Sequence, residues 1–186
     1  MASNTLHPYL PDELWFRFNP LGIHGVPHTT RVLLWADRLA GMIAAPEAIR
    51  GEELRWAASV HDVGRVDDGV DPGHGGRSAD WVREKLVGVR PATAAINLGF
   101  VAELCRWHER QDQEIERLSL ELLILKDADA LDRARLGDLD PRRLRLARSH
   151  DLIDEAMRLE RATNSYGSIG AVDVLVVAQR LGLFKS

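Results

Sequence analysis

The chain has 186 residues, of which 45% are hydrophobic and 28% charged, a composition typical of one globular domain and not of a disordered chain. Its net charge of -4 argues against a surface that binds nucleic acid over its whole extent, and its single cysteine, Cys105, excludes an internal disulfide. The first residues lack the order of a signal peptide, and no apolar run approaches the length of a membrane span. We therefore expect a cytoplasmic protein that does not enter a membrane.

Helical spacing begins near residue 27. Pro27 fits the first turn of a helix. The residues behind it form one apolar stripe: Val32, Trp35, Ala36, Leu39 and Ile43. Pro46 is expected to begin a second helix, whose inward face carries Leu54. Residues 65–76 contain four glycines and a proline, so we expect a loop there.

Three more helices are predicted before residue 137. The first covers about 75–87, and Pro91 begins the next, which carries Cys105 on its apolar face. The third covers residues 117–135, and Gly137 can stop it.

The last third of the chain is also predicted to be helical. Pro141 should begin a helix that runs, with a possible break near Ser149, to about residue 163. The β-branched run in 171–184 could form a strand, but no other segment offers a strand to pair with it, so we expect a helix. The sequence predicts an all-α helical bundle that forms a single domain over residues 1–186.

Ionisable side chains interrupt the apolar faces of four predicted helices. His28, His61, His108 and Asp127 each lie four or seven residues from apolar core positions of their own helix. Residues at these spacings share one helix face. Imidazoles and carboxylates are therefore expected to point into the interior from separate parts of the chain.

The adjacent pair His61-Asp62 needs a particular backbone. Neighbouring helical residues diverge by about 100°, so two such side chains meet at one small ligand only where a helix ends. Gly64 follows the pair and indicates such an end.

Buried carboxylates need a positive partner, and two kinds are open at this stage. One is ordinary pairing: a single inward histidine usually bonds a backbone carbonyl, Asp62 could cap a helix, and Asp127 could pair with an arginine. The other is a metal ion, because imidazole and carboxylate together suit zinc, manganese, iron, cobalt or nickel. The recurrence of such residues on several helices favours a shared site.

Four segments in order resemble the HD superfamily of metal-dependent phosphohydrolases. They are "HGVPHTTRV", "ASVHDVGR", "DPGHGGRSA" and "ILKDADALD", and the resemblance covers about residues 20–135. It implies an all-α fold, with the C-terminal helices of 141–186 packed on this motif-bearing core.

The resemblance also implies a metal site. Four residues correspond by position to the ligands of one divalent ion: His28, His61, Asp62 and Asp127. Members with two ions have two further ligands before the last Asp, and His74 and His108 fall in that interval. Asp62 would then bridge one ion and the other. His24 matches nothing in the motif and is read as a loop residue.

The implied activity is hydrolysis of a phosphate ester or anhydride by metal-activated water. A divalent ion lowers the pKa of bound water from 15.7 towards about 7 and neutralises a phosphoryl oxygen. Asp62 and Arg65 are the candidate catalytic residues, and Arg65, Arg77 and Arg133 are candidates for binding substrate phosphates, although each arginine could also be an ordinary surface residue. The expected substrate is a small phosphorylated compound, foremost a nucleotide; the sequence offers no base-reading motif, so a nucleic acid is not expected.

Three other functions fit the same residues. Some members of the superfamily are di-iron oxygenases, which would hold two irons and consume oxygen. A nuclease would release nucleotides from a single strand. A non-catalytic module would sense a nucleotide through a metal site whose coordination is closed.

Overall fold

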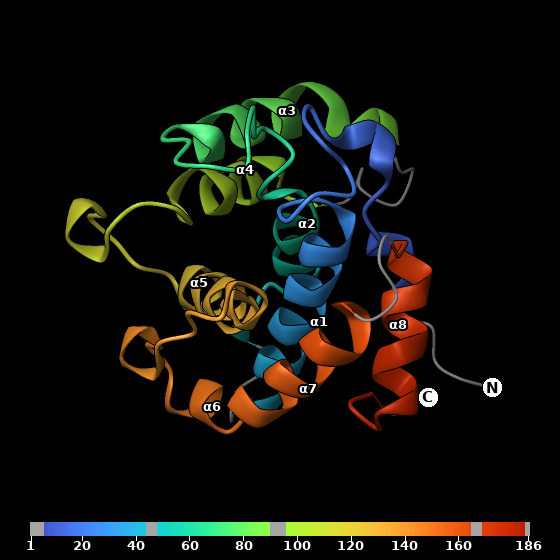
Figure 1. Ribbon diagram of the computed structural model, residues 1–186. Helices are drawn as coiled ribbons and strands as arrows, with labels where there is room; N and C mark the ends of the chain where they lie inside the picture. Colours follow the sequence, from blue (N-terminus) through green and yellow to red (C-terminus); the bar gives the residue numbers. More distant parts are fainter. Residues whose placement is uncertain (1–5, 44–47, 90–95, 165–168, 185–186) are drawn as a thin grey trace.

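The computed structural model describes residues 6–43, 48–89, 96–164 and 169–184 of the chain (Figure 1). All regular elements within these ranges are helices, which confirms the predicted all-α fold. The α-helices are α1 (Val26–Met42), α2 (Gly51–Val60), α3 (His74–Val89), α4 (Leu98–Trp107), α5 (Leu120–Asp132), α6 (Ala147–His150), α7 (Ile153–Asn164) and α8 (Ala171–Arg180). Short 3-10 turns are η1 (His7–Tyr9), η2 (Glu13–Trp15), η5 (Asp112–Glu114), η6 (Arg133–Leu136) and η7 (Pro141–Arg143).

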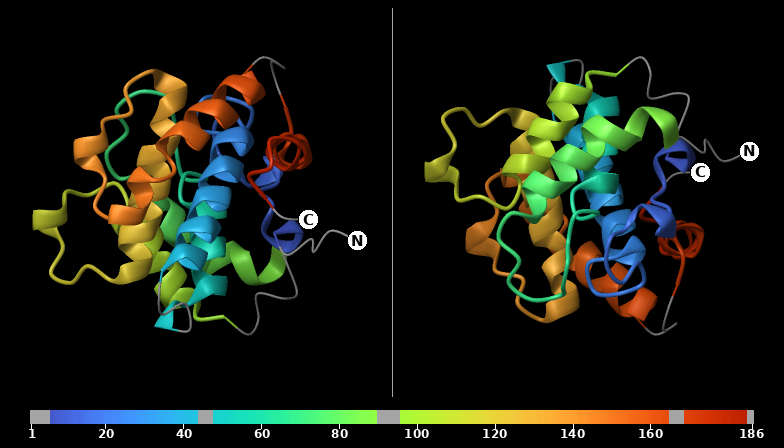
Figure 2. Two further views of the ribbon diagram at one scale, coloured as in Figure 1. Left: turned by 90° about the horizontal axis from the view of Figure 1, so that it is seen from below. Right: turned by 90° about the horizontal axis from the view of Figure 1, so that it is seen from above.

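Helix α1 lies at the centre and packs against α2, α5 and α8 (Figures 1 and 2). Four members of its apolar stripe are buried: Val32, Ala36 and Leu39 expose none of their surface, and Trp35 exposes 1%. Burying one such side chain contributes about 1.5–3 kcal/mol. The last member, Ile43, is partly buried. Helices α3 and α4 pack on each other, and α4 also contacts α2, so α1, α2, α4 and α5 surround one interior.

Several helix boundaries follow the sequence signals. Pro27 occupies the first turn of α1, as expected. Gly137 ends the 3-10 turn after α5 in the left-handed conformation, with φ of 69°, which glycine adopts without strain. Residues 171–180 form a helix, as expected. Pro46 and Pro91 lie outside the described residues.

The helix predicted from Pro141 to about 163 is wrong in its first half. The chain instead forms the short turn η7, the one-turn helix α6 and then α7, with extended backbone at Leu144 and Leu146. The physical reason is a hydrogen-bond acceptor on another helix, which the hydrophobic pattern of residues 141–163 does not reveal. The buried carboxylate of Asp127 accepts the backbone N–H groups of Arg145 and Leu146, at 2.9 and 2.8 Å, and so satisfies a stretch that is not helical.

Two glycines set how closely the segments around the His-Asp pair approach one another. Helix α2 ends at Val60, and residues 61–64 form turns, as the pair requires. A Cβ on Gly64 would lie 2.5 Å from the backbone N of Ser78, and one on Gly75 would lie 2.6 Å from the carbonyl oxygen of Cys105. Only glycine lets α3 lie this close to the 61–64 turn and to α4.

The connections before and after α5 extend from the bundle at one edge (Figures 1 and 2). Among the described residues, no helix has both the length and the apolar character that a membrane crossing requires.

Candidate metal centre

Five histidine rings form a continuous row between α1, α2, α3 and α4. Their centroids are 5.6 Å apart for His24 and His28, 5.3 Å for His28 and His61, 4.8 Å for His61 and His108, and 4.9 Å for His108 and His74. Four rings come from helix ends: the first turn of α1, the residue after α2, the first residue of α3 and the residue after α4. All but His24 are buried.

The Nδ1 atoms of four rings are held by acceptors. Three of them lie within hydrogen-bond distance of backbone carbonyls three residues earlier: His61 to Ala58 at 2.8 Å, His74 to Asp71 at 2.7 Å and His108 to Cys105 at 2.6 Å. The fourth, in His28, lies 2.7 Å from Oδ2 of Asp132. A carbonyl or carboxylate oxygen can only accept, so each Nδ1 carries the proton. In a neutral ring the lone pair is then on Nε2.

These Nε2 atoms face one another in two pairs. His28 and His61 bring theirs to 3.3 Å, and His74 and His108 bring theirs to 3.0 Å. Two lone pairs at these distances repel unless a cation or a proton lies beside them. Neutral imidazole nitrogens held in this way are the ligands that divalent transition metals use in proteins.

The carboxylate of Asp62 lies between the two pairs. Its Oδ2 is 3.5 Å from Nε2 of His28 and 3.9 Å from that of His61, whereas its Oδ1 is 3.1 Å from His74 and 3.5 Å from His108. Oδ1 is buried and has no hydrogen-bond partner among the residues that the structure describes. An orphaned buried carboxylate oxygen surrounded by imidazole nitrogens fits a divalent cation.

The last carboxylate of the centre is Asp129 and not Asp127. Oδ1 of Asp129 lies 3.5 Å from Nε2 of His28, and His28, His61 and Asp129 form a group that could hold a metal ion. Asp127 exposes none of its surface, points to the 145–149 segment and accepts from Ser149 Oγ at 2.7 Å. The two residues point about 160° apart around the axis of α5, and α5 is buried on more than one side. For this reason the apolar stripe did not identify the face that meets the histidines.

Asp132 holds His28 from behind. Besides the His28 ring, its carboxylate accepts from Nε and Nη2 of Arg31 at 2.6 and 3.1 Å, and all three side chains are buried. Such a partner fixes the orientation of a ligating imidazole and raises its basicity. Sequence reasoning missed both Asp129 and Asp132. The spacing Leu125, Asp129, Asp132 would have been the signal for a second face of α5.

His24 and Arg65 both contact Oδ2 of Asp62, His24 through Nδ1 at 3.0 Å and Arg65 through Nε at 3.1 Å. The expectation that His24 is only a loop residue misses its place in the centre: it does precede α1, but with His28 and Asp62 it forms a further group that could hold an ion. Arg65 lies where the sequence suggested, beside the His-Asp pair. One turn of chain, residues 20–25, brings His24 back to the ring of His28.

The other two candidate phosphate-binding arginines lie in different surroundings. Arg77 donates from Nε to the carbonyl of Gly64 at 2.7 Å and pairs with Asp71, so it fastens α3 to the loop after the His-Asp pair. Arg133 pairs with Asp138 and lines two cavities that meet at the centre. The structure therefore brings Arg65 and Arg133 to the centre and leaves Arg77 in a supporting position.

The electrostatics of the side chains in the centre agree with this geometry. Burial lowers the pKa of His61 to about 3. Burial would raise the pKa of Asp62, but His61, His108, His24 and His28 hold it well below its usual value. For His74, burial opposes protonation, yet the nearby Asp62 raises the pKa. A proton on His74 thus relieves the repulsion between the facing Nε2 lone pairs of His74 and His108, as a metal ion would. A metal ion would therefore compete with this proton.

Family comparison agrees with the residues just described. The model of the HD domain matches residues 26–134, more than half of the chain, and the chain therefore belongs to the HD domain family, a superfamily of metal-dependent phosphohydrolases. Comparison with curated proteins found no match, and neither did comparison with solved structures. The matched segment runs from the start of α1 to η6 and contains all of the centre except His24.

Proposed function

We propose that this protein is a metal-dependent phosphohydrolase that acts on a small phosphorylated compound, foremost a nucleotide. The observation that carries the proposal is the arrangement of two facing pairs of Nε2 atoms, one beside each carboxylate oxygen of Asp62. Membership of the HD domain family supports the same chemistry.

The donor set supports two divalent ions rather than one. His28, His61 and Asp129 would hold the first, His74 and His108 the second, and Asp62 would bridge them. Manganese, iron, cobalt, nickel and zinc all accept this mixture of nitrogen and oxygen ligands. When bound, such ions supply a water of lowered pKa and neutralise a phosphoryl oxygen.

The remaining residues orient the centre and the substrate. Asp132 and the three backbone carbonyls keep the imidazoles in their ligating tautomer. Arg65, whose side chain is 13% exposed, would hold phosphate oxygens at the edge of the centre. A cavity of about 360 Å³ opens there, and Asp62, His74, His108 and Asp129 contribute to its wall.

Metal analysis of the purified protein, followed by a phosphate-release screen, tests the proposal. The screen would cover nucleotides, nucleotide alarmones and small phosphomonoesters, each with manganese, cobalt and nickel. We expect about two metal ions per chain and phosphate release from at least one class of substrate. Protein that retains no transition metal and releases no phosphate from any of them would refute the proposal.

Asp62→Ala is the most direct variant, because Asp62 has one carboxylate oxygen beside each imidazole pair. We expect loss of bound metal and of turnover together, measured by elemental analysis and phosphate release. His150→Ala, an exposed histidine outside the centre, is the matched control and should keep both. Wild-type turnover in an Asp62→Ala protein without metal would contradict the assignment.

The three other functions give different results in the same experiments. A di-iron oxygenase would contain two irons as purified and consume oxygen with its substrate, whereas activity with manganese under anaerobic conditions excludes it. A nuclease would release nucleotides from single-stranded DNA or RNA. A sensing module would bind its nucleotide unchanged for hours with all ligands intact.

A further inference from the structure

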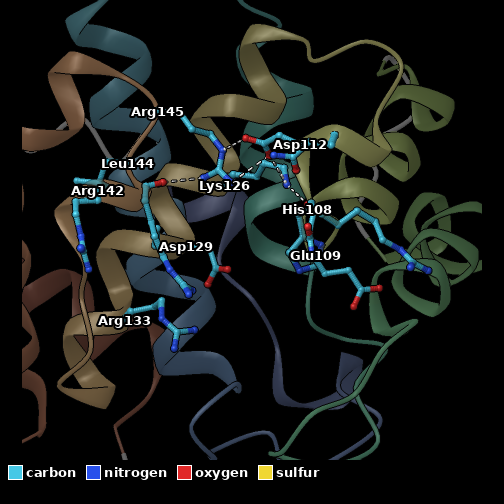
Figure 3. Close-up of a pocket in the computed structure, with 14 residues that line it drawn as sticks. His108, Glu109, Asp112, Lys126, Asp129, Arg133, Arg142, Leu144 and Arg145 are labelled. Atoms are coloured by element: carbon cyan, nitrogen blue, oxygen red, sulfur yellow. Dashed lines mark hydrogen bonds and ion pairs between the residues drawn. The ribbon is translucent and has the colours of Figure 1, made fainter.

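A second, larger cavity adjoins the metal centre. It has a volume of about 650 Å³, within the range of small-molecule sites, and it shares His108, Glu109, Asp129 and Arg133 with the cavity of about 360 Å³ described above. We call the larger one the arginine cavity and the smaller one the histidine cavity. Figure 3 draws Arg133 and Arg142 on one side of the arginine cavity and His108 and Glu109 on the other, with Asp129 between them.

The two cavities differ in charge. Three arginines and four carboxylates line the histidine cavity. Three carboxylates line the arginine cavity, Glu109, Asp112 and Asp129, against six cations: Arg110, Lys126, Arg133, Arg142, Arg143 and Arg145. Asp129 belongs to the metal centre, and Glu109 lies 3.0 Å from Nδ1 of His74, so both face the histidines. Among the lining residues this leaves Asp112 to face six cations. Four of them also pair with carboxylates outside the lining: Arg110 with Glu114, Arg133 with Asp138, Arg142 with Asp140 and Arg145 with Asp127.

The internal partners of these cations leave room for an anion. Asp112 pairs with both Lys126 at 3.1 Å and Arg145 at 2.8 Å. Lys126 also donates to the carbonyl of Arg110, and Arg145 also pairs with Asp127 at 3.3 Å. Burial lowers the pKa of Lys126, and its pairing with Asp112 opposes that effect only in part. Arg142 is 90% exposed and pairs with Asp140 at the rim, and such exposed pairs exchange readily for a stronger ligand. The guanidinium of Arg143 has no hydrogen-bond partner within the described part of the chain.

Asp127 holds the arginine-bearing segment in place. Its carboxylate accepts the backbone N–H groups of Arg145 and Leu146, the hydroxyl of Ser149 and, at 3.3 Å, Nη1 of Arg145. Asp127 lies on the same helix as Asp129, two residues away. Helix α5 therefore fixes the position of the arginines relative to the metal centre.

The segment that carries Arg142, Arg143 and Arg145 lies outside the matched domain. The HD match ends at residue 134, whereas Arg142, Arg143 and Arg145 follow it in the sequence. Three of the six cations of the arginine cavity therefore follow the matched segment in the sequence, whereas Arg110, Lys126 and Arg133 lie within it.

We propose that the arginine cavity binds phosphoryl groups of the substrate other than the one that reacts, so that the enzyme selects compounds with two or more phosphoryl groups over monophosphates. The proposal rests on the proposed function, because it places the reacting phosphorus at the histidine centre. Asp127 acts as a positioning residue for this cavity.

A binding experiment tests the cavity without turnover. The probes are a triphosphate analogue whose three phosphoryl groups are joined by methylene bridges, and methylphosphonate, which has one; water hydrolyses neither. Affinities of the manganese-loaded protein are measured by calorimetry. We expect Arg142→Gln/Arg143→Gln to weaken the triphosphate analogue about tenfold or more and methylphosphonate less than twofold, because charged hydrogen bonds to the remote groups are lost.

The matched control is Arg148→Gln/Arg161→Gln, which removes the same charge from exposed positions outside both cavities. It should bind both probes as the wild type does. Equal losses in the two double variants, or equal losses for the two probes, would overturn the proposal. Asp127→Asn should weaken only the analogue and keep the metal; weakening of both probes alike would overturn its positioning role.

The same data separate this proposal from the proposed function. Suppose that Arg142→Gln/Arg143→Gln loses affinity for the triphosphate analogue alone and that the wild type hydrolyses no phosphate compound. The binding role of the arginine cavity is then supported, and the proposed hydrolase activity is refuted. Suppose instead that the wild type releases phosphate from a monophosphate and that Arg142→Gln/Arg143→Gln binds the triphosphate analogue as tightly as the wild type does. The proposed hydrolase activity is then supported, and the binding role of the arginine cavity is refuted.

Discussion

The histidine centre and the arginine cavity share one wall but are built differently. In the centre the four buried imidazoles are each fixed at Nδ1, three by backbone carbonyls and one by Asp132. In the cavity Arg142, Arg143 and Arg145 come from a segment with little regular structure, and Arg142 pairs with the partly exposed Asp140. Under the two proposals above, the chemistry is placed where buried partners fix each imidazole. Recognition of the rest of the substrate is placed where Asp127 fixes the backbone and the side chains of Arg142 and Arg143 are exposed.

The largest difference between the two regions is expected when the two carboxylates of α5, Asp129 and Asp127, are changed separately. Asp129→Asn removes a negative charge beside His28, so we expect bound metal to fall and turnover to drop about 10²–10³-fold. Asp127→Asn should leave the metal in place and lower the free energy of unfolding by roughly 1–3 kcal/mol, because charged hydrogen bonds to the 145–149 segment are lost. Elemental analysis, phosphate release and urea unfolding measure these effects. Metal loss in Asp127→Asn with metal retained in Asp129→Asn would reverse the assignment.

A smaller effect on metal affinity is expected from a change at Asp132, which contacts the His28 ring at Nδ1. Asp132→Asn keeps the shape of the side chain but weakens the orientation of the His28 ring, so metal affinity should fall about 10–100-fold. The neighbouring buried Arg31 would also lose its partner, which should make the variant easier to unfold. Competition with a fluorescent chelator measures the affinity. The exposed pair of Arg148 and Asp151 offers a control, since Asp151→Asn should change neither quantity.

Arg65 should contribute less again. Arg65→Ala is expected to reduce kcat/KM about tenfold and to leave metal content unchanged, because Arg65 contacts Asp62 from the edge of the centre. Arg83→Ala, at an exposed position on α3, is the control. If Arg65→Ala lost metal and kept its activity, Arg65 would support the metal ligands and would not bind substrate.

The pH dependence of the metal-free protein sharpens the comparison further. His61 has a folded pKa of about 3 against about 6.5 in the unfolded chain, so protonation favours unfolding. Its contribution to stability is complete above about pH 6.5 and falls by about 1.4 kcal/mol per unit as the pH drops below that value. His24, whose pKa burial also lowers, acts in the same direction, and His74, whose pKa is raised, acts in the opposite one.

Urea unfolding of chelator-treated protein between pH 6.5 and 4.5 measures this slope, because the carboxylates of the centre titrate at lower pH. His61→Gln should flatten it, and His150→Gln should not. An unchanged slope in His61→Gln would show that the ring is not buried in its neutral form.

The sequence predicted most of the helices within the described residues and most of the histidines of the centre, because helical spacing reports which side of a helix is buried. It failed at Asp127 because a helix buried on several sides has no single inward face, and at His24 because a residue outside a helix has no periodicity to place it. Residues 141–150 were read as helical because their pattern fits a helix. Their actual backbone depends on a carboxylate about 18 residues earlier, and such long-range capture leaves no local signal.

Gly75 illustrates how a residue without functional groups can govern chemistry. Its missing side chain lets α3 approach the carbonyl of Cys105, the same oxygen that holds the His108 ring. A methyl group there would push two helices apart and separate His74 from His108. In a survey of single substitutions that measures activity alone, a substitution at Gly75 should reduce activity as substitutions at the proposed metal ligands do. The cause would be the larger distance between α3 and α4 and not the loss of a ligand.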